Sequence, residues 1–392
     1  MGFFNDTELV PPDPILGLTV AFLEDERPNK VNLGVGAYRT DGLEPFVLDC
    51  VRKAEARLLE QGLDMEYAPV EGPRDYIEGS HRLIFGELSE ELAERTFVTQ
   101  SPGGTGGLRL VGELVAREMA PRIGLSTPSW VNHELIFTRS RHELHHYPYG
   151  GGDTIDSGAM LDAISKLPER TALIIQPCCH NPVGLDPDRD TWLELCEITK
   201  RLDLFPIFDF AYQGFGESVE DDAWPIRHFA REGVELAVTQ SYSKNMGLYG
   251  HRVGALHVLA ATPDDARRIG TQLKRTIRSF YSTPPCHGAR LVGTVLSDSE
   301  LTANWRAELE QMRQRIVAMR DGLAGALSEA GATLEVPSGQ RGMFWLSGLS
   351  REQVDRLRDD HAIYCPSSGR LNLAGLAPGS LRQVAEAVAT VG

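Results

Sequence analysis

The stretch Ser241-Tyr-Ser-Lys-Asn-Met-Gly-Leu-Tyr-Gly-His-Arg-Val-Gly254 gives the clearest indication of the fold. It follows Leu236-Ala-Val-Thr-Gln240, a short and mostly apolar run that predicts a buried strand. Similar runs, bounded by turn residues, occur at Thr171–Gln176 and Phe205–Asp209. From about residue 45 to 300 such runs alternate with amphipathic stretches, which predicts an α/β fold with a mostly parallel sheet.

Lys244 lies where a parallel sheet binds its ligands. The segment that contains it leaves the predicted strand at the carboxyl end, and open α/β sheets bind ligands outside that edge. A lysine forms a Schiff base with an aldehyde cofactor, whereas Ser241, Ser243 and Arg252 are residue types that hold a phosphate. The chain has only six lysines, so few others compete for this role. For this segment alone, a surface loop with a solvated lysine is the alternative.

The composition narrows the class of protein. A chain of 392 residues, 42% of them hydrophobic, is long enough for two domains or one large α/β unit. Its net charge of −16 argues against nucleic acid or an anionic membrane as a partner, because both need a basic surface. No apolar stretch approaches the roughly 18 residues of a membrane span, and the first residues do not resemble a signal peptide. Six scattered cysteines without CxxC spacing favour reduced thiols in the cytoplasm.

Two segments outside the predicted sheet indicate the domain organisation. Residues 1–30 contain four prolines, which predicts an extended arm before the first strand. Residues 301–330 carry apolar side chains at steps of three or four, from Trp305 to Leu327, which predicts one long helix. We expect this helix to cross from the sheet domain into a smaller carboxyl-terminal domain, with a cleft between the two.

Three further motifs follow predicted strands. Ser101-Pro-Gly-Gly-Thr-Gly-Gly-Leu108 precedes an amphipathic helix, whose N-terminus attracts a phosphate, although a tight structural turn is the alternative. Asp209 ends an apolar run, where a buried carboxylate needs a partner such as a pyridinium nitrogen; a helix N-cap is its alternative. Asn181, within Cys178-Cys-His-Asn-Pro-Val-Gly184, could donate to a phenolate oxygen. Adjacent cysteines have poor ligand geometry, so we expect no metal there.

Two arginines bear on the substrate. Arg278 and Arg370 each stand among apolar or small residues, in Ile277–Pro285 and Ser368–Leu373. A partly buried guanidinium binds a carboxylate through two parallel hydrogen bonds. A structural ion pair with an aspartate or a glutamate is the alternative for either arginine.

Taken together, the order and spacing of these motifs resemble the class I aminotransferases that act on aspartate and aromatic amino acids. These are fold type I enzymes that depend on pyridoxal 5′-phosphate. The resemblance runs from Asp13–Leu18 through Val31–Tyr38 to Ser368–Gly375. It implies a homodimer with shared active sites. It also implies three parts of the chain: an amino-terminal arm at 1–14, a small domain at 15–45 and 312–392, and a large cofactor-binding domain at 46–311.

The resemblance assigns a role to each matching residue. Lys244 would carry the cofactor and act as the base that moves the substrate proton. The cofactor ring would contact Asp209 at its nitrogen, with His133 behind that carboxylate, and also Trp130, Asn181 and Tyr212. The phosphate would be bound by Gly104, Thr105, Ser241, Ser243, Arg252 and Tyr67 of the partner subunit. The substrate would be bound by Arg370 at its α-carboxylate, by Gly36, Trp130 and Asn181, and by Arg278 of the partner subunit at a distal carboxylate.

Several departures from the aspartate-specific pattern bear on the substrate. Thr283 stands where asparagine is usual, Glu66 where a neutral side chain is usual, and Gln176 where a histidine is common. A carboxylate at Glu66 near Arg278 would weaken the binding of dicarboxylates. We therefore predict transamination between glutamate/2-oxoglutarate and an aromatic L-amino acid, including a modified one. Aspartate aminotransfer is the alternative, and oxidation, decarboxylation or elimination with the same cofactor is a more distant one.

Overall fold

The computed structural model describes residues 2–10, 14–151 and 153–392. Parts of the predicted arm, residues 1 and 11–13, lie outside the described residues, as does Asp13 of the family resemblance. The prediction of an extended chain over residues 1–30 is wrong for the part that forms helix α1 (Pro14–Glu24). Proline is tolerated in the first turn of a helix, and no proline occurs between Pro14 and Pro28, so the sequence permits this helix.

The centre of the molecule is a seven-stranded sheet within the described residues, in the order β2-β10-β9-β8-β7-β3-β4. All neighbours from β9 to β4 run parallel, whereas β10 is antiparallel to both β2 and β9. The predicted α/β fold with a mostly parallel sheet is therefore confirmed. The strands are β2 (Thr96–Pro102), β3 (Arg122–Thr127), β4 (Glu143–Pro148), β7 (Ala172–Ile175), β8 (Phe205–Phe210), β9 (Leu236–Ser241) and β10 (Val253–Leu259).

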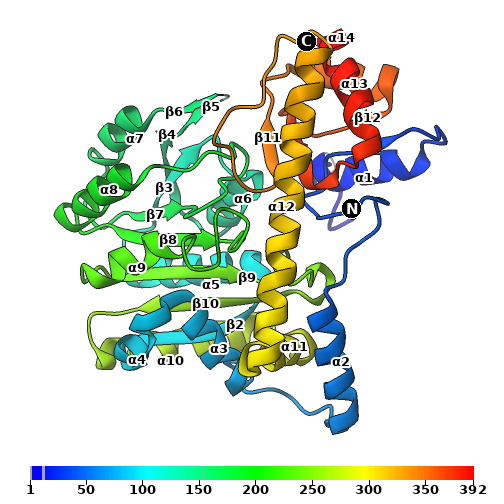
Figure 1. Ribbon diagram of the computed structural model, residues 1–392. Coiled ribbons are helices and arrows are strands. Elements are labelled where there is room, and N and C mark those ends of the chain that lie inside the picture. Colours follow the sequence, from blue (N-terminus) through cyan, green and yellow to red (C-terminus); the bar gives the residue numbers. More distant parts are fainter. Residues whose placement is uncertain (1, 11–13, 152) are drawn as a thin grey trace.

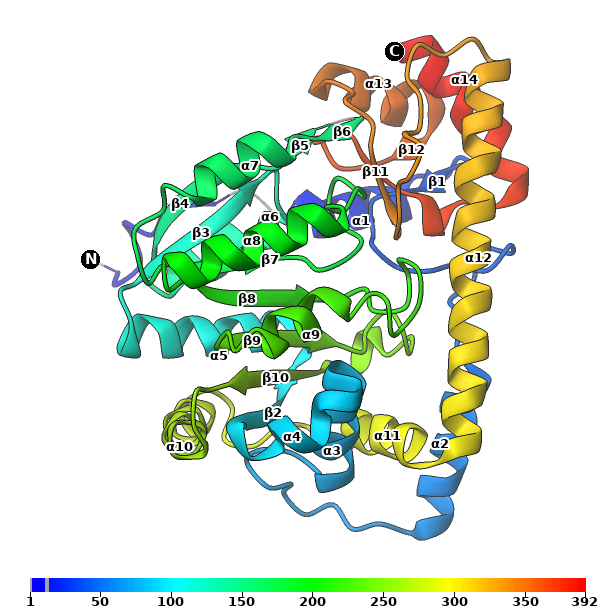
Figure 2. The same cartoon turned by 60° about the vertical axis from the view of Figure 1, so that its left-hand side comes forward.

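Helices cover both faces of this sheet, and alternate side chains of each strand point to opposite faces. In β7, Ala172 and Ile174 pack with one apolar cluster and Leu173 and Ile175 with another, so the whole strand is buried. One face carries α5 (Gly103–Glu118), α6 (Val131–Arg139) and α10 (Pro263–Phe280). The other carries α7 (Ser157–Ile164), α8 (Arg189–Arg201) and α9 (Trp224–Arg231) (Figure 2). Beside these lie α2 (Asp49–Gln61), α3 (Arg74–Phe85), α4 (Ser89–Leu92) and α11 (Cys286–Ser297).

The long helix α12 (Ser299–Glu329) confirms the prediction for residues 301–330 and runs the full height of the molecule (Figure 1). Its first half, including Trp305 and Leu309, packs into the core of the sheet domain. Its second half, including Leu323 and Leu327, packs into a separate apolar cluster with the C-terminal elements. The C-terminal elements are β11 (Phe344–Leu346), α13 (Arg351–His361), β12 (Ile363–Tyr364), β13 (Arg370–Asn372) and α14 (Leu381–Val391). The N-terminal strand β1 (Val31–Asn32) belongs to the same cluster. A small hairpin, β5 (Gly150–Gly151) and β6 (Thr154–Ile155), lies near β4.

Candidate active site

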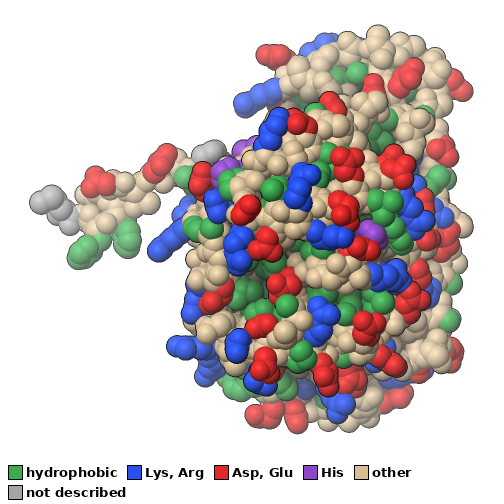
Figure 3. Space-filling view, turned by 90° about the vertical axis from the view of Figure 1, so that its left-hand side faces the viewer, with side chains coloured by type: hydrophobic (Ala, Val, Ile, Leu, Met, Phe, Trp, Pro, Cys, Tyr) green, Lys and Arg blue, Asp and Glu red, His purple; other side chains and the backbone are tan. Residues whose placement is uncertain are grey.

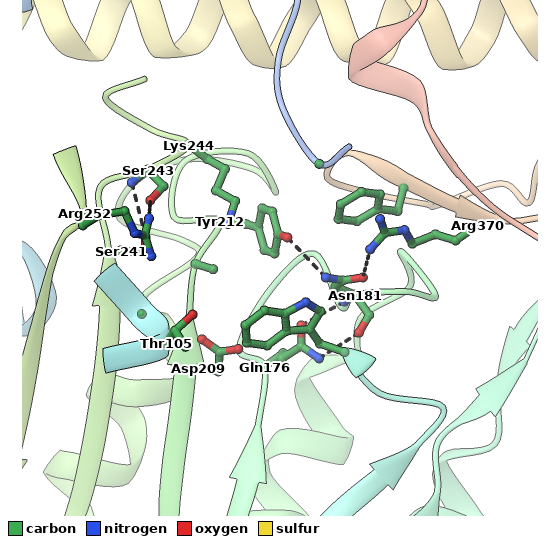
Figure 4. Close-up of a pocket in the computed structure, with 15 residues that line it drawn as sticks. Thr105, Gln176, Asn181, Asp209, Tyr212, Ser241, Ser243, Lys244, Arg252 and Arg370 are labelled. Carbon is green, nitrogen blue, oxygen red and sulfur yellow. Dashed lines mark hydrogen bonds between the residues drawn. The ribbon is translucent and has the colours of Figure 1, made fainter. Parts of the chain in front are cut away.

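A pocket of about 800 Å³, counting its open mouth, lies at the carboxyl edge of β7, β8 and β9 (Figure 4). The sheet supplies its floor and one side, and β11, β13 and the segment after β1 supply the other. The lining residues are Gly36, Gly104, Thr105, Trp130, Gln176, Asn181, Asp209, Ala211, Tyr212, Ser241, Ser243, Lys244, Arg252, Phe344 and Arg370. Most of the site residues predicted from the sequence thus line one cavity, between the large sheet and the C-terminal elements.

Lys244 points into this pocket from the loop after β9 (Figure 4). Its Nζ lies 5.1 Å from the centre of the Tyr212 ring, and no hydrogen bond to Nζ occurs within the described residues. The pKa of this amine is lowered to about 8, chiefly because the amine loses water on burial; Arg252 and Arg370 add to the lowering, and Asp209 opposes it. The solvated surface lysine considered above therefore does not describe this side chain. An amine with such a pKa is uncharged often enough near neutral pH to act as a nucleophile or a base.

One end of the pocket is built to hold an anion. Helix α5 begins at Gly103, so its free N–H groups face this end, and Ser241 and Ser243 add hydroxyl groups. The guanidinium of Arg252 bonds the Ser243 hydroxyl at 3.4 Å and backbone carbonyls, and it has no acidic partner within the described residues. Gly103 has φ +71°, and a Cβ there would lie 2.5 Å from Arg252 Nη2. Only glycine therefore lets the helix start this close to the arginine.

The floor of the pocket carries a chain of hydrogen bonds that ends at Asp209. Asp209 Oδ2 lies 2.9 Å from His133 Nε2, and His133 Nδ1 lies 2.8 Å from the Ser129 hydroxyl. Asp209 and His133 are both buried. Asp209 belongs to β8 and no helix begins beside it, so the N-cap alternative does not apply. His133 therefore lies behind the carboxylate. The other carboxylate oxygen, Oδ1, accepts a hydrogen bond from the Thr239 hydroxyl at 3.5 Å.

The opposite end of the pocket is built around Arg370. Its Nη1 donates to Asn181 Oδ1 at 3.0 Å and its Nη2 to the Gly34 carbonyl at 2.8 Å, while its Nε is buried without a partner. Burial lowers the pKa of this guanidinium, and no acidic side chain pairs with it within the described residues. The structural ion pair considered above is therefore absent there. A buried guanidinium without a counter-ion is a receptor for a carboxylate.

Three lining residues were not assigned a role from the sequence. Phe344 places its ring 4.1 Å from the Arg370 guanidinium and edge-on to Tyr212, with ring centres 5.9 Å apart. Ala211 lies between Phe210 and Tyr212 and contributes a small side chain. Gln176, noted from the sequence only as a departure from the family, is the first residue after β7. Phe344 sits in an apolar run like many others, so no local signal distinguishes it.

Two predicted site residues lie outside the pocket of their own chain. Tyr67 is 84% exposed, and Arg278 is exposed at the end of α10, where it bonds the Ser282 hydroxyl. Glu66 is also exposed, and it makes no ion pair with Arg278 within the described residues. Tyr67 and Arg278 therefore do not line the pocket of their own chain.

The donor set fits pyridoxal phosphate. The pocket holds the Lys244 amine, an anion-binding end at Arg252 and a carboxylate, Asp209, on its floor. A Cβ added at Gly104 would come within 3.6 Å of the Ser241 Cβ and 3.9 Å of Asp209 Oδ1, so a larger residue would fill this cradle. Within the described residues, no group of three or more histidine, cysteine or acidic side chains could hold a metal ion.

The comparisons with known proteins define the class. The family model for class I and II aminotransferases matches residues 28–388, so the chain belongs to this family. It is a pyridoxal-phosphate-dependent aminotransferase, as predicted. No helix in the described part is long and apolar enough to cross a membrane.

The relatives carry two substrate names. An aromatic-amino-acid aminotransferase from Pseudomonas aeruginosa is 44% identical over 100% of this chain and 99% of its own length. A mitochondrial aspartate aminotransferase from Xenopus tropicalis is 41% identical over 98% of this chain and 92% of its own length. The structure of an aromatic-amino-acid aminotransferase from Burkholderia pseudomallei, covalently bound to pyridoxal phosphate, superposes with a TM-score of 0.94, 41% identity and complete coverage of both chains. The cytoplasmic aspartate aminotransferase of Saccharomyces cerevisiae gives a TM-score of 0.96 at 34% identity, with 99% and 98% coverage.

Proposed function

We propose that this enzyme transfers an amino group between glutamate/2-oxoglutarate and an aromatic L-amino acid, with Lys244 and Arg370 as its central residues. The observation that carries the proposal is their placement in one pocket. Neither side chain has an acidic partner within the described residues; Lys244 is partly buried and Arg370 is buried. One end of the pocket thus supplies an amine and the other a carboxylate receptor, which are the two groups that an amino acid requires.

Pyridoxal phosphate, when bound, supplies an aldehyde that joins to an amine and a ring that withdraws electrons from the substrate's α-carbon. Arg370 holds the substrate carboxylate and so fixes the α-carbon in the pocket. Lys244 Nζ, with a pKa of about 8, takes the proton from that carbon and returns it to a neighbouring atom. Burial raises the pKa of Tyr212, so its hydroxyl stays protonated and can donate a hydrogen bond. Asp209, on the floor, favours a protonated ring nitrogen.

The preference for aromatic amino acids rests on the wall of the pocket and on the relatives. Trp130, Tyr212 and Phe344 line the cavity, and this ring-rich wall suits a flat apolar side chain. The P. aeruginosa relative, at 44% identity, is named for aromatic amino acids. Retention of Arg278 supports glutamate and 2-oxoglutarate as the second pair, since this arginine can bind their distal carboxylate.

Single amino acids distinguish the two substrate classes. We expect phenylalanine, tyrosine and glutamate each to bleach the visible absorbance of the bound cofactor in single-turnover mixing, with aspartate at least about tenfold slower. Rapid bleaching by aspartate would instead support an aspartate aminotransferase, which the relatives of 40–41% identity favour as the second candidate. Release of CO₂ or consumption of oxygen, without bleaching by any amino acid, would contradict transamination itself.

A homodimer with shared sites belongs to the proposal and is supported by the side chains that lie outside the pocket. Tyr67 and Arg278 are exposed in the single chain, and Leu59 and Met65 beside them are 82% and 96% exposed. Residues 2–10 also stand away from the body with apolar side chains outward, and Phe3 is fully exposed (Figure 3). A second copy of the chain would bury these surfaces and bring Tyr67 and Arg278 to its pocket.

Mixed dimers test the shared site. A Lys244→Met subunit and an Arg278→Leu subunit would together form one complete site, in which Lys244 and Arg278 come from different chains. We expect mixed dimers, isolated through two affinity tags, to recover about half of the wild-type activity with glutamate and 2-oxoglutarate. Mixing Lys244→Met with Arg370→Lys is the matched control, because these residues line one pocket and mixing cannot reunite them. Equal inactivity of both mixtures would contradict the shared site.

Two further assignments belong to this proposal. The division into a small domain (15–45 and 312–392) and a large domain (46–311) is supported by the two apolar clusters that meet along α12. A cytoplasmic location is supported by the six cysteines, all of which are free.

A further inference from the structure

We infer that Gln176 is a positioning residue that fixes Asn181, and through it the orientation of Arg370 and Tyr212; the inference rests on the proposed function of this pocket. Gln176 is the first residue after β7 and is only 5% exposed. It belongs to the pocket wall, and its side-chain oxygen and nitrogen each make a hydrogen bond to the protein (Figure 4). Its role therefore depends on the residue that it holds.

The carboxamide of Gln176 pairs with the backbone of a single residue. Asn181 N–H donates to Gln176 Oε1 at 2.9 Å, and Gln176 Nε2 donates to the Asn181 carbonyl at 3.1 Å. Two hydrogen bonds to one residue fix both its position and its rotation, which a single bond does not. The pairing needs one donor and one acceptor on the same planar group, and glutamine offers both without a charge. A carboxylate at this position would face the Asn181 carbonyl oxygen and repel it.

The side chain of Asn181 contacts two functional side chains, so the position of its backbone affects their orientation. Its Oδ1 accepts a hydrogen bond from Arg370 Nη1 at 3.0 Å, and its Nδ2 lies 3.4 Å from the Tyr212 hydroxyl. All four side chains are buried, so water does not replace a lost partner. A rotation of Asn181 would therefore change the direction of the Arg370 fork, on which binding of a carboxylate depends.

The turn that contains Asn181 has other anchors, so loss of Gln176 should free the asparagine without unfolding the loop. The backbone N–H groups of Cys179 and His180 donate to the Asp186 carboxylate at 2.7 and 3.0 Å. Further along the turn, Gln340 Nε2 donates to the Val183 carbonyl at 2.9 Å. Gln340 is, like Gln176, a glutamine of 5% exposure that holds this turn, but within the described residues it makes no hydrogen bond to Arg370 or Tyr212. It provides a matched control.

The test compares Gln176→Leu with Gln340→Leu in the holoenzyme. We expect Gln176→Leu to weaken binding of two unreactive carboxylates, 3-phenylpropanoate and succinate, by about tenfold. KM for the amino acid and for the oxo acid should rise together by about tenfold, and kcat should change by less than about threefold. The pH midpoint of the cofactor's absorbance change should rise by about one unit, because a misplaced Asn181 and Tyr212 stabilise an anionic ring oxygen less well. Gln340→Leu should leave all these values unchanged.

Equal carboxylate affinities and equal absorbance midpoints in the two variants would overturn the inference and leave Gln176 as part of the turn's packing. If Gln176→Leu fails to fold, Gln176→Asn makes the same test, because its shorter amide cannot span both bonds and should give a smaller change in the same direction. Failure of the proposed function looks different. In that case the wild-type holoenzyme would bind neither carboxylate and no amino acid would bleach its cofactor.

Discussion

Replacement of Lys244 by methionine should lower kcat/KM for every substrate by at least about 10⁵-fold, while the enzyme still binds pyridoxal phosphate. The expected loss is this large because, in the proposed function, Lys244 is both the attachment point and the base, and no other lysine of the described residues lines the pocket. Asp209 and the anion-binding end around Arg252 remain in the variant, so the cofactor should still be retained on gel filtration. Measurable turnover at a tenth of the wild-type rate would assign the chemistry to another residue.

The same variant reports on the pKa of Lys244 without any turnover. Burial lowers this pKa from 10.5 to about 8, so the unfolded chain holds the proton more tightly than the folded one. Below pH 8 the folded protein therefore bears the cost of a poorly solvated charge, and between about pH 8 and 10.5 that cost declines as the pH rises. The cost amounts to at most about 3 kcal/mol, reduced by water at the pocket mouth.

Cofactor-free Lys244→Met should accordingly unfold at a higher denaturant concentration than the cofactor-free wild type at pH 7. The difference should shrink by pH 10, because the wild-type amine is then neutral in the folded state. Denaturation of both proteins at the two pH values measures this effect. A difference that does not vary with pH would show that Lys244 has an ordinary pKa. Lys53 is exposed, and its ion pair with Asp49 raises its pKa, so Lys53→Met is a control that should not unfold at a higher denaturant concentration than the wild type at pH 7.

Replacement of Arg370 by leucine should reduce kcat/KM for all substrates by about 10³-fold, and replacement by lysine by about 10²-fold. Leucine removes the positive charge, whereas lysine keeps it but cannot form two parallel hydrogen bonds. Both effects should be seen equally with phenylalanine, glutamate and 2-oxoglutarate, because all of them carry the α-carboxylate. The loss should occur mainly in KM, since a carboxylate is bound before and during the reaction alike.

Arg320 supplies the control for this experiment. It is a second buried arginine without an acidic partner within the described residues, and it donates to the Gly342 carbonyl from α12, outside the pocket. Arg320→Lys should lower thermal stability as much as Arg370→Lys and leave kcat/KM within about threefold of the wild type. An equal loss of activity in the two variants would mean that Arg370 acts through stability and not through substrate binding.

The chemistry of the site could be predicted mostly from short motifs, because each motif follows a strand and the ends of parallel strands converge. Lys244 and Asp209 come from β9 and β8, which are neighbours in the sheet, so their convergence follows once the sheet is predicted. The glycine-rich turn likewise predicts the anion-binding end, because a helix must start where its backbone can approach a ligand. The strand-end residues and the glycine-rich turn can be recognised from short stretches of sequence.

Other features depend on contacts between distant parts of the chain. Arg370 and Asn181 are 189 residues apart, and only packing of the C-terminal elements against the sheet brings them together. Phe344 lies in an apolar run that resembles any core strand. Gln176 bonds the backbone of Asn181, and nothing in the sequence around Gln176 indicates this partner. Residues 14–24 were predicted as extended on the basis of nearby prolines, but they form a helix, since proline in the first turn costs little.

The sequence by itself therefore determined the fold class, the family and the residue types of the site, because strand periodicity and strand-end motifs are encoded within about ten residues. The tertiary structure alone decided which cations lack acidic partners within the described residues, which side chains hold Asn181, and that Tyr67 and Arg278 are exposed outside the pocket of their own chain. Burial and pairing are properties of the packed molecule. They arise from surfaces far apart in the chain, whose mutual position no short stretch of sequence specifies.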